Sequence, residues 1–350
     1  MLSLQVVDFM SKKLIVIFAF CSLQTALFSQ TGGDNVYEFL NLTHSAYVSS
    51  IGGHNVSSFN NDPNLAFHNP GLLNASMDNS FVLNFVNYFA GINYGMTMYS
   101  RSLEGIGNFG VGLTYLNYGS FIAADPSSII TGTFSSSEYA MSLMYSRSID
   151  SLFNIGINLK PILSHLENYT SFGFAVDIGA SWNSENKLFS AGIALRNIGL
   201  QMTSYQGEAR QPLPFEIQAG ASQKLPHAPF CFSLTLRHLE KFDLTHEYID
   251  SHTSSNGGSD FGENLLRHVI LGAELIPHKN FYVSGGYNYQ RRSELRVDAR
   301  GSTVGFSWGF GVKTSAIDIE FGRSAYHLAG SSNHVSMIFR PEMIIRKTKL

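Results

Sequence analysis

From about residue 78 to its end, the chain alternates apolar and polar residues in stretches of about ten, each followed by a turn. One such stretch, from Val304 to Val312, places valine, phenylalanine and tryptophan at the even positions and glycine or serine between them. Because successive side chains of a strand point to opposite faces, each stretch has one bulky apolar face and one small or polar face. A dozen or more such units, with almost no helical periodicity between them, predict a closed barrel whose apolar face meets lipid.

About fourteen stretches fit this pattern, an even number as bacterial barrels require. The predicted strands are 79–89, 91–101, 107–118, 137–148, 152–165, 170–183, 187–197, 214–224, 229–240, 267–276, 280–290, 303–312, 316–326 and 333–342. The expected fold class is therefore all-β, a transmembrane outer-membrane β-barrel of antiparallel strands over residues 77–350, preceded by a short N-terminal helical plug.

The lengths of the links between the predicted strands support this interpretation. From the third strand on, long and short links alternate. The long links are 119–136, 198–213, 241–266 and 291–302, and the short ones are 149–151, 183–186, 226–228, 277–279 and 313–315. Long external loops and tight periplasmic turns are typical of transmembrane barrels. If both chain ends are periplasmic, every long link lies outside the cell, although the early links 89–91 and 101–107 fit this scheme less well.

Composition agrees with a surface that faces hydrocarbon. Only 14% of the 350 residues are charged, against about 25% in a typical soluble domain. Mean hydropathy is only +0.01, because the second face of each strand is polar. Beyond the N-terminal segment no apolar run reaches the roughly 20 residues of a spanning helix. The net charge of −3 gives no reason to expect a nucleic-acid partner.

Residues 1–29 have the features of a secretory signal peptide. Lys12 and Lys13 form the charged region, an apolar core runs from Leu14 to Leu27, and the small residue Ser29 precedes the expected cleavage site. A membrane anchor is the alternative. Cleavage would place the mature protein in the cell outer membrane and leave Cys231 as its one cysteine, so that no internal disulfide can form.

Residues 30–76 differ from the barrel pattern. Apolar residues at roughly helical spacing predict a helix over 36–50, which Gly52 and Gly53 would end. Polar turns follow at 60–64 and 68–71. Because the segment is too short to build a core of its own, we expect a plug inside the barrel or under its periplasmic mouth.

Several charged residues fall on the non-lipid face of the predicted strands: Lys160, Asp177, Arg196, Glu216, Arg237, Glu274, Asp318, Glu320 and Arg323. A basic residue on the lipid face near the midplane costs about 2–4 kcal/mol. We therefore expect these side chains to form ion pairs that hold the plug, or, alternatively, to line a conduit. Cys231 should also point inward, as a small filler.

The sequence gives little support for a catalytic or metal-binding site. The twelve histidines are scattered, with no H-E-x-x-H and no cysteine pair for zinc. The acidic residues and histidines of the link 241–266 are expected to be solvated. We predict no catalytic residues, no cofactor and no metal site.

The segment 34–74 carries a more specific signal. Its motifs are N-V-Y-E-F-L at 35–40, I-G-G at 51–53 and D-P-N-L-A-F-H-N-P-G-L-L at 62–73. These motifs resemble the opening of the PorQ family, outer-membrane components of the type IX secretion system of Bacteroidota. The residues that carry the resemblance are Tyr37, Phe39, Leu40, Gly52, Gly53, Asp62, Asn69 and Pro70. More distantly, FadL-type fatty-acid transporters share a plug, fourteen strands and an Asn-Pro turn.

The resemblance implies a non-enzymatic barrel of the attachment complex. Such a barrel would hold a PorZ-like surface protein beside the PorU–PorV sortase pair, which processes and anchors secreted cargo. Its other neighbours would be outer-membrane lipid and lipopolysaccharide. An alternative function is a FadL-like channel for hydrophobic solutes, which needs a continuous apolar path past the plug. A weaker third hypothesis is an interfacial lipid hydrolase.

Overall fold

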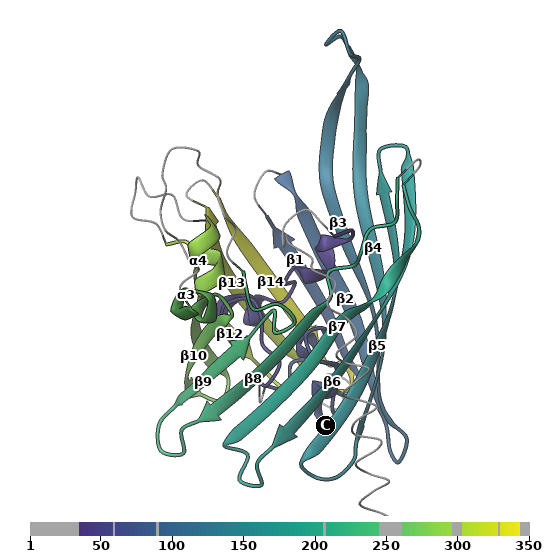
Figure 1. Ribbon diagram of the computed structural model, residues 1–350. Helices are drawn as coiled ribbons and strands as arrows, with labels where there is room; N and C mark the ends of the chain where they lie inside the picture. Colours follow the sequence, from purple (N-terminus) through teal and green to yellow (C-terminus); the bar gives the residue numbers. More distant parts are fainter. Residues whose placement is uncertain are drawn as a thin grey trace, which may run out of the picture. The chain divides into compact units, whose positions relative to one another are not determined.

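The computed structural model describes residues 35–58, 60–88, 91–205, 208–244, 261–295, 303–327 and 330–343. Within them, antiparallel strands close a barrel in which each strand pairs with its sequence neighbours and the first pairs with the last (Figure 1). The strands are β1 (Ser80–Asn87), β2 (Asn93–Leu103), β3 (Gly107–Ala124), β4 (Ile130–Ser148), β5 (Phe153–Leu166), β6 (Tyr169–Asn183), β7 (Phe189–Thr203), β8 (Glu216–Lys224), β9 (Phe230–Leu236), β10 (Val269–His278), β11 (Phe281–Asn288), β12 (Phe306–Lys313), β13 (Ile317–His327) and β14 (Gly330–Phe339). Each predicted strand corresponds to one of these fourteen, so the fold class is confirmed.

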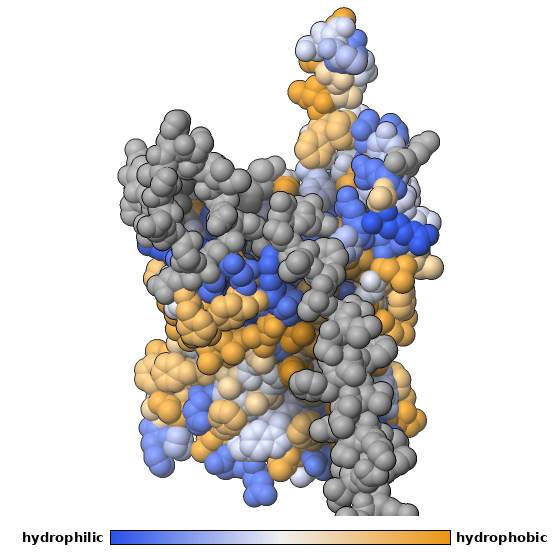
Figure 2. Space-filling model, viewed as in Figure 1, coloured by the Kyte–Doolittle hydropathy of each residue, from blue (hydrophilic) through white to orange (hydrophobic). Residues whose placement is uncertain are grey.

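The outer face of the wall is apolar, as the alternation predicts. In β12, Trp308, Phe310 and Val312 are about half exposed, while Gly309 and Gly311 between them are buried. Exposed hydrophobic residues are spread over the visible wall, and hydrophilic residues gather toward both ends (Figure 2). Cys231 points inward and is buried, as predicted. No helix in the described part of the chain is long and apolar enough to cross a bilayer.

The two ends of the barrel differ in their connections. At the end that we call the turn end, the links are 104–106, 149–152, 184–188, 225–229, 279–280 and 314–316, and the chain enters β1 and leaves β14 there. At the opposite end, the loop end, the links are 88–92, 125–129, 167–168, 204–215, 237–268, 289–305 and 328–329. All the long links lie at the loop end, and the early links also fit this arrangement.

Parts of the predicted loops are regular structure. β3 and β4 continue through most of 119–136 and leave a turn at 125–129, and β7 extends to Thr203. Cross-strand pairing of Phe121 with Phe134, whose rings stack, favours this extension. The links 241–266 and 291–302 begin or end in short helices, α3 (Phe261–Arg267) and α4 (Tyr289–Leu295). The remainder of these two links, 245–260 and 296–302, lies outside the described residues, as does the predicted signal peptide.

Residues 35–58 and 60–79, which we call the plug, lie inside the barrel. They form the single-turn helices η1 (Glu38–Asn41), η2 (Pro63–Phe67), η3 (Pro70–Leu72) and η4 (Ala75–Met77) and one short α-helix, α2 (Ala46–Ser50). Most of their side chains are buried.

The predicted continuous helix over 36–50 is wrong. Tyr37 is left-handed with φ 61°, and the chain is extended at Leu42 and Ser45, where the Ser45 side chain caps α2. Wall side chains bind the backbone groups that a longer helix would use: Arg196 donates to the carbonyl of Leu40, and Ser336 accepts from the amide of Ala46. The predicted end of the helix is confirmed, because Gly52 and Gly53 both have positive φ.

Candidate functional site

The interface between the plug and the inner wall is the candidate functional site. Serine hydroxyls make many of its contacts. Three hydroxyl pairs join the plug to three strands: Ser49 with Ser324 at 2.8 Å, Ser50 with Ser284 at 2.6 Å, and Ser57 with Ser222 at 2.9 Å. Because the inward residues of the strands are small, the plug backbone approaches the wall closely enough for these bonds. The small polar positions of the alternating pattern therefore form a docking surface for the plug.

The Asn69-Pro70-Gly71 elbow is held most tightly. The Asn69 amide donates to the Ala180 carbonyl at 3.0 Å, and its oxygen accepts from the Gly71 amide at 2.9 Å. The Gly71 carbonyl in turn accepts from Ser181 at 2.7 Å and from Asn154 at 2.6 Å. One asparagine thus links a turn of the plug to β6, while the carbonyl next to it links the plug to β5 and β6.

The elbow requires glycine in the wall beneath it. A Cβ built on Gly156 would overlap the Pro70 carbonyl, and one on Gly179 would overlap the Asn69 side-chain oxygen. Any larger residue at these two positions would push the elbow away from the wall.

At the loop end, Tyr37, Phe39 and Leu40 anchor the start of the plug. They belong to a buried apolar cluster: Val36, Tyr37, Phe39, Leu40, Val86, Tyr94, Leu116, Ala140, Ile162, Ala175 and Leu213. The Tyr37 hydroxyl lies 2.5 Å from the Ser171 hydroxyl, and burial raises the pKa of Tyr37. These three side chains seal the plug against the wall by apolar contact.

Gly52 and Gly53 turn the chain against β11 and α4. The Thr43 hydroxyl donates to the Gly53 carbonyl, and the Asn288 amide donates to the Gly52 carbonyl at 3.4 Å. A Cβ on Gly53 would lie 2.8 Å from the Arg291 guanidinium. Glycine is favoured at these positions because the turn has positive φ at both and because Arg291 lies close to Gly53.

Asp62 lies at the turn end, near the positive charge of Lys313 and the negative charge of Asp318. One of its oxygens accepts from the Asn64 amide at 2.9 Å, and burial raises the pKa of its carboxyl. Lys313 is nearby: its ammonium donates to Asn60 at 2.6 Å and lies 5.0 Å from the centre of the Tyr282 ring.

The eight residues that carry the family resemblance therefore all lie in the plug. Asn69 and Pro70 act together, whereas the other six occupy three separate contact areas. Their arrangement is that of a docked segment, and it groups no set of acid, base and nucleophile. Sequence reasoning missed the partners on the wall, such as Asn154, Ser181 and Asn197, although their inward, small or polar positions gave the signal.

The predicted inward charges mostly form ion pairs. The shortest separations are 2.7 Å for Lys160 with Asp177, 2.6 Å for Arg237 with Glu216, and 2.7 Å for Arg340 with Asp318. The charges that contact the plug directly are Glu274, which accepts from the Tyr47 hydroxyl at 2.6 Å, and Arg196. Pairing and plug contacts thus occupy most of these side chains.

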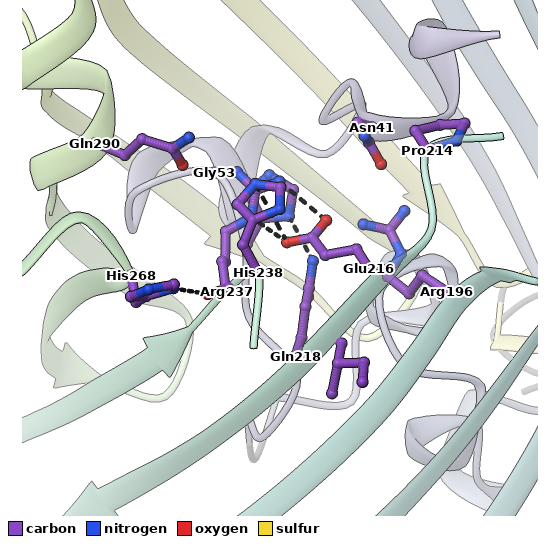
Figure 3. A network of polar contacts seen from close by, with 12 residues as sticks. Asn41, Gly53, Arg196, Pro214, Glu216, Gln218, Arg237, His238, His268 and Gln290 are labelled. Carbon is purple, nitrogen blue, oxygen red and sulfur yellow. Dashed lines mark hydrogen bonds and ion pairs between the residues drawn. The ribbon is translucent and has the colours of Figure 1, made fainter. Parts of the chain in front are cut away.

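Figure 3 shows the network around Glu216. Its carboxylate accepts two hydrogen bonds from Arg237, at 2.6 and 3.0 Å, and Gln218 lies next to it on β8. Gln218 reaches His54 of the plug at 3.4 Å, and burial lowers the pKa of His54 well below its ordinary value. A neutral histidine thus meets the wall here, so that it adds no further positive charge beside Arg237.

The predicted inward position of Arg323 is wrong. It shares the outer face of β13 with Ile319 and Phe321, pairs with Trp308 of β12, and is exposed. Its guanidinium donates to Asn333 at 3.3 Å. Because Arg323 lies toward the loop end, its charge is close to the interfacial zone, where an outward arginine costs only about 0–1 kcal/mol.

Cavities of different size remain between the plug and the wall. An interior cavity of about 20 Å³ touches Phe39, His68 and Lys160, enough for about one water. Two larger cavities, of about 360 and 610 Å³, lie at the turn end. The first is lined by seven charged side chains together with aromatic and aliphatic ones such as Tyr47, Ile276 and Phe281, and the second mainly by serine and asparagine.

Comparisons with known proteins find similar structures but no similar sequences. No protein-family model matches the chain, and no curated protein matches its sequence. Among solved structures, the Pseudomonas putida toluene transporter TodX is similar, with a TM-score of 0.50, 11% identity, and coverage of 85% of this chain and 96% of that one. A deltaS2 mutant of the TodX monoaromatic hydrocarbon channel is similar with a TM-score of 0.51 and 11% identity, and the match covers 86% of this chain and 98% of that one. A Pseudomonas aeruginosa FadL homologue has a TM-score of 0.48 and 12% identity, and the match covers 85% of this chain and 98% of that one.

At such low identity the TodX likeness establishes the fold, a fourteen-strand barrel of the outer-membrane type. By the general rule for such barrels, the turn end faces the periplasm and the loop end faces outward from the cell.

Proposed function

We propose that the protein is a non-enzymatic outer-membrane barrel, closed by its own plug, which anchors a protein partner at the cell surface. This is the role that the resemblance to the PorQ family implies: a PorZ-like surface protein held near a PorU–PorV-like sortase complex. The observation that carries the proposal is the docking of the plug on most sides of the wall through hydrogen bonds of buried hydroxyls, amides and charged side chains.

A docked plug argues against free passage through the lumen. A hydrophobic solute needs a largely apolar pocket of about 300–1,000 Å³. The two larger cavities have that size, but charged and polar side chains line much of both. The interior cavity has a lining that includes apolar residues but holds about 20 Å³.

The loop end offers surfaces for a partner. Glu263 of α3 accepts from Arg267 at 2.7 Å and from Ser293 of α4 at 3.5 Å, so the two helices brace each other. Phe261 and Leu265 of α3 are exposed beside this contact. A braced rim with exposed apolar side chains is a suitable support for a bound protein.

A FadL-like channel for hydrophobic solutes is the second candidate. The comparisons favour it over an anchor, because the similar structures are described as hydrocarbon transporters and channels. Half-buried aromatic and aliphatic residues at the loop end, Tyr88, Ile92, Tyr118 and Tyr205, could receive such a solute.

One experiment separates the two candidates. The purified barrel is reconstituted in liposomes, and uptake of oleate and of toluene is measured against a variant that lacks residues 35–76. An anchor should take up neither compound above empty liposomes, whereas the plugless variant should conduct. Uptake by the intact barrel would overturn the anchor and support the channel.

A second experiment tests anchoring itself. Each long link is shortened in turn in cells, and the proteins released into the medium are identified by mass spectrometry. We expect at least one variant to release a surface protein while its barrel still resists unfolding in detergent at room temperature. An unchanged set of surface proteins in all variants would contradict anchoring.

A further inference from the structure

β3 and β4 rise beyond the rest of the barrel at the loop end (Figure 1). Pairing of β2 with β3 stops at Asn117, and pairing of β5 with β4 stops at Ser136. Beyond these residues the two strands pair only with each other within the described part of the chain. We call residues 118–135 the ribbon. Its two outer edges, along 118–124 and 130–135, carry backbone donors and acceptors that no strand of the described residues uses.

The ribbon is ordered by its own contacts. Tyr118 and Gly119 together oppose Ser136, which makes a bulge, and Gly119 has the positive φ of 88° that such a bulge favours. At the tip, the Asp125 carboxylate accepts from the amides of Ser127 and Ile129, both at 2.9 Å. The bulge re-aims the strands at the base, and the aspartate fixes the turn.

The side chains of the ribbon are unusual for a surface in water. Ile122, Ile129 and Ile130 are 63–68% exposed. By the register, Ile122 and Ile130 share one face, and the stacked pair of Phe121 and Phe134 lies on the other. Apolar side chains also stand out on the projecting hairpin in Figure 2. Both faces are therefore partly apolar.

The ribbon also lacks the usual protection of an exposed edge. Natural proteins blunt free strand edges with lysine, proline or inward charges. Between Tyr118 and Ser137 the one charged residue is Asp125, which the turn uses, and the one proline is Pro126, in the same turn. Free edges without these devices are templates for another strand.

We propose that the ribbon is a strand-addition site for a cell-surface protein that presents the free edge of its own β-sheet. The occupant must be a strand, because only a strand satisfies alternating backbone donors and acceptors along an edge. It must also be poor in charge, because the ribbon offers no ion-pair partner along either edge. Each edge spans about 20 Å at about 3.3 Å per residue, the length of an ordinary strand. This inference rests on the proposed anchoring function and identifies the chemistry of the anchored partner.

The test uses a photo-crosslinking amino acid, p-benzoylphenylalanine, placed singly at positions 120, 122 and 124 of the full-length protein in whole cells. These positions share one face of β3. Strand addition should yield adducts with one surface protein at residues that step by two along a strand at its sheet edge. With the crosslinking residue at position 120 or 124, the double variant Ile122→Lys with Ile130→Lys should reduce adduct yield by about tenfold or more. Ile149→Lys, an exposed isoleucine in a turn-end link, is the matched control and should leave the yield unchanged.

Several results would overturn the inference. They are adducts with lipopolysaccharide alone, adducts with a second copy of this chain, and adducts whose positions do not step by two. If shortening the link 237–268 releases the surface protein but replacing 119–135 by an Asn-Gly turn does not, the inference fails while anchoring stands. If no variant releases a surface protein, both fail.

Discussion

Lys160 of β5 and Asp177 of β6 form an ion pair on the inner wall, with 2.7 Å between Nζ and Oδ1 and both side chains buried. Asn197, in a bulge of β7, completes the arrangement. Its backbone amide donates to Asp177 at 2.8 Å, and its side-chain amide donates to Asn41 of the plug at 3.1 Å. The pair therefore connects three strands to the plug.

We predict that Asp177→Asn destabilises the barrel by about 3–5 kcal/mol, because it leaves the Lys160 ammonium buried without a counter-charge. The free energy of unfolding is measured by urea titration of the refolded barrel in detergent micelles. The double variant Lys160→Met with Asp177→Leu removes both charges and should cost clearly less than the single variant. Equal urea midpoints for Asp177→Asn and the native protein would contradict a stabilising pair.

Gly179→Ala should displace the plug elbow. The added Cβ would overlap the Asn69 side-chain oxygen and crowd Pro70, and overpacking of this kind costs about 1–3 kcal/mol. We expect faster protease cleavage within residues 60–74 and a larger ion conductance in planar bilayers.

The matched control for this variant is Gly285→Ala. Its Cβ would meet only the Ser307 carbonyl, at 3.7 Å, an ordinary contact. The prediction fails if both variants show the same cleavage rate and conductance.

The strands could be predicted from the sequence because their faces alternate with a strict period of two. Seven of the nine predicted inward charges are buried, and the eighth, Arg237, is nearly so. The period-two alternation itself places Arg323 outward, on the same face of β13 as Ile319 and Phe321, and the inward prediction followed its charge instead.

The conformation of the plug could not be predicted in the same way. Its backbone groups are bound by wall residues far away in the sequence, as when Ser336 accepts from the amide of Ala46, 290 positions earlier. Helical spacing over 36–50 reflects the burial of apolar residues on the wall, and tertiary hydrogen bonds decide the local structure. The roles of Asn69 and Pro70 depend on contacts with β5 and β6, which lie far from them in the sequence.

Tyr47→Phe should loosen the contact of the plug with β10. The Tyr47 hydroxyl donates to the buried Glu274 carboxylate at 2.6 Å, and a buried acceptor left without its donor costs about 1–3 kcal/mol. We expect a lower urea midpoint at unchanged secondary structure.

Tyr282→Phe is the matched control, since the two rings are in edge contact at 5.6 Å. The Tyr282 hydroxyl is buried and faces the Glu320 carboxylate, without a hydrogen bond of ordinary geometry within the described part of the chain. Its loss should be neutral or slightly stabilising. A control variant as unstable as Tyr47→Phe would show that the ring contact, and not the hydroxyl, is what matters.

The stability of the plugged barrel should fall as the pH rises from about 4, in part through Asp62. Burial raises the pKa of this carboxyl above its ordinary value of 3.8, so the folded protein holds the proton more tightly than the unfolded chain. The contribution is fully present below the unfolded pKa and is lost as the pH rises through the folded one. One group changes the free energy of unfolding by at most about 1.36 kcal/mol per pH unit. Urea midpoints are measured from pH 4 up to the folded pKa of Asp62, about 6. They should fall less for Asp62→Asn, whose side-chain oxygen still accepts from the backbone amide of Asn64. They should fall as in the native protein for the control Asp150→Asn, which changes an exposed carboxylate in a turn-end link. An Asp62→Asn curve parallel to the native one would show that this carboxyl does not titrate there.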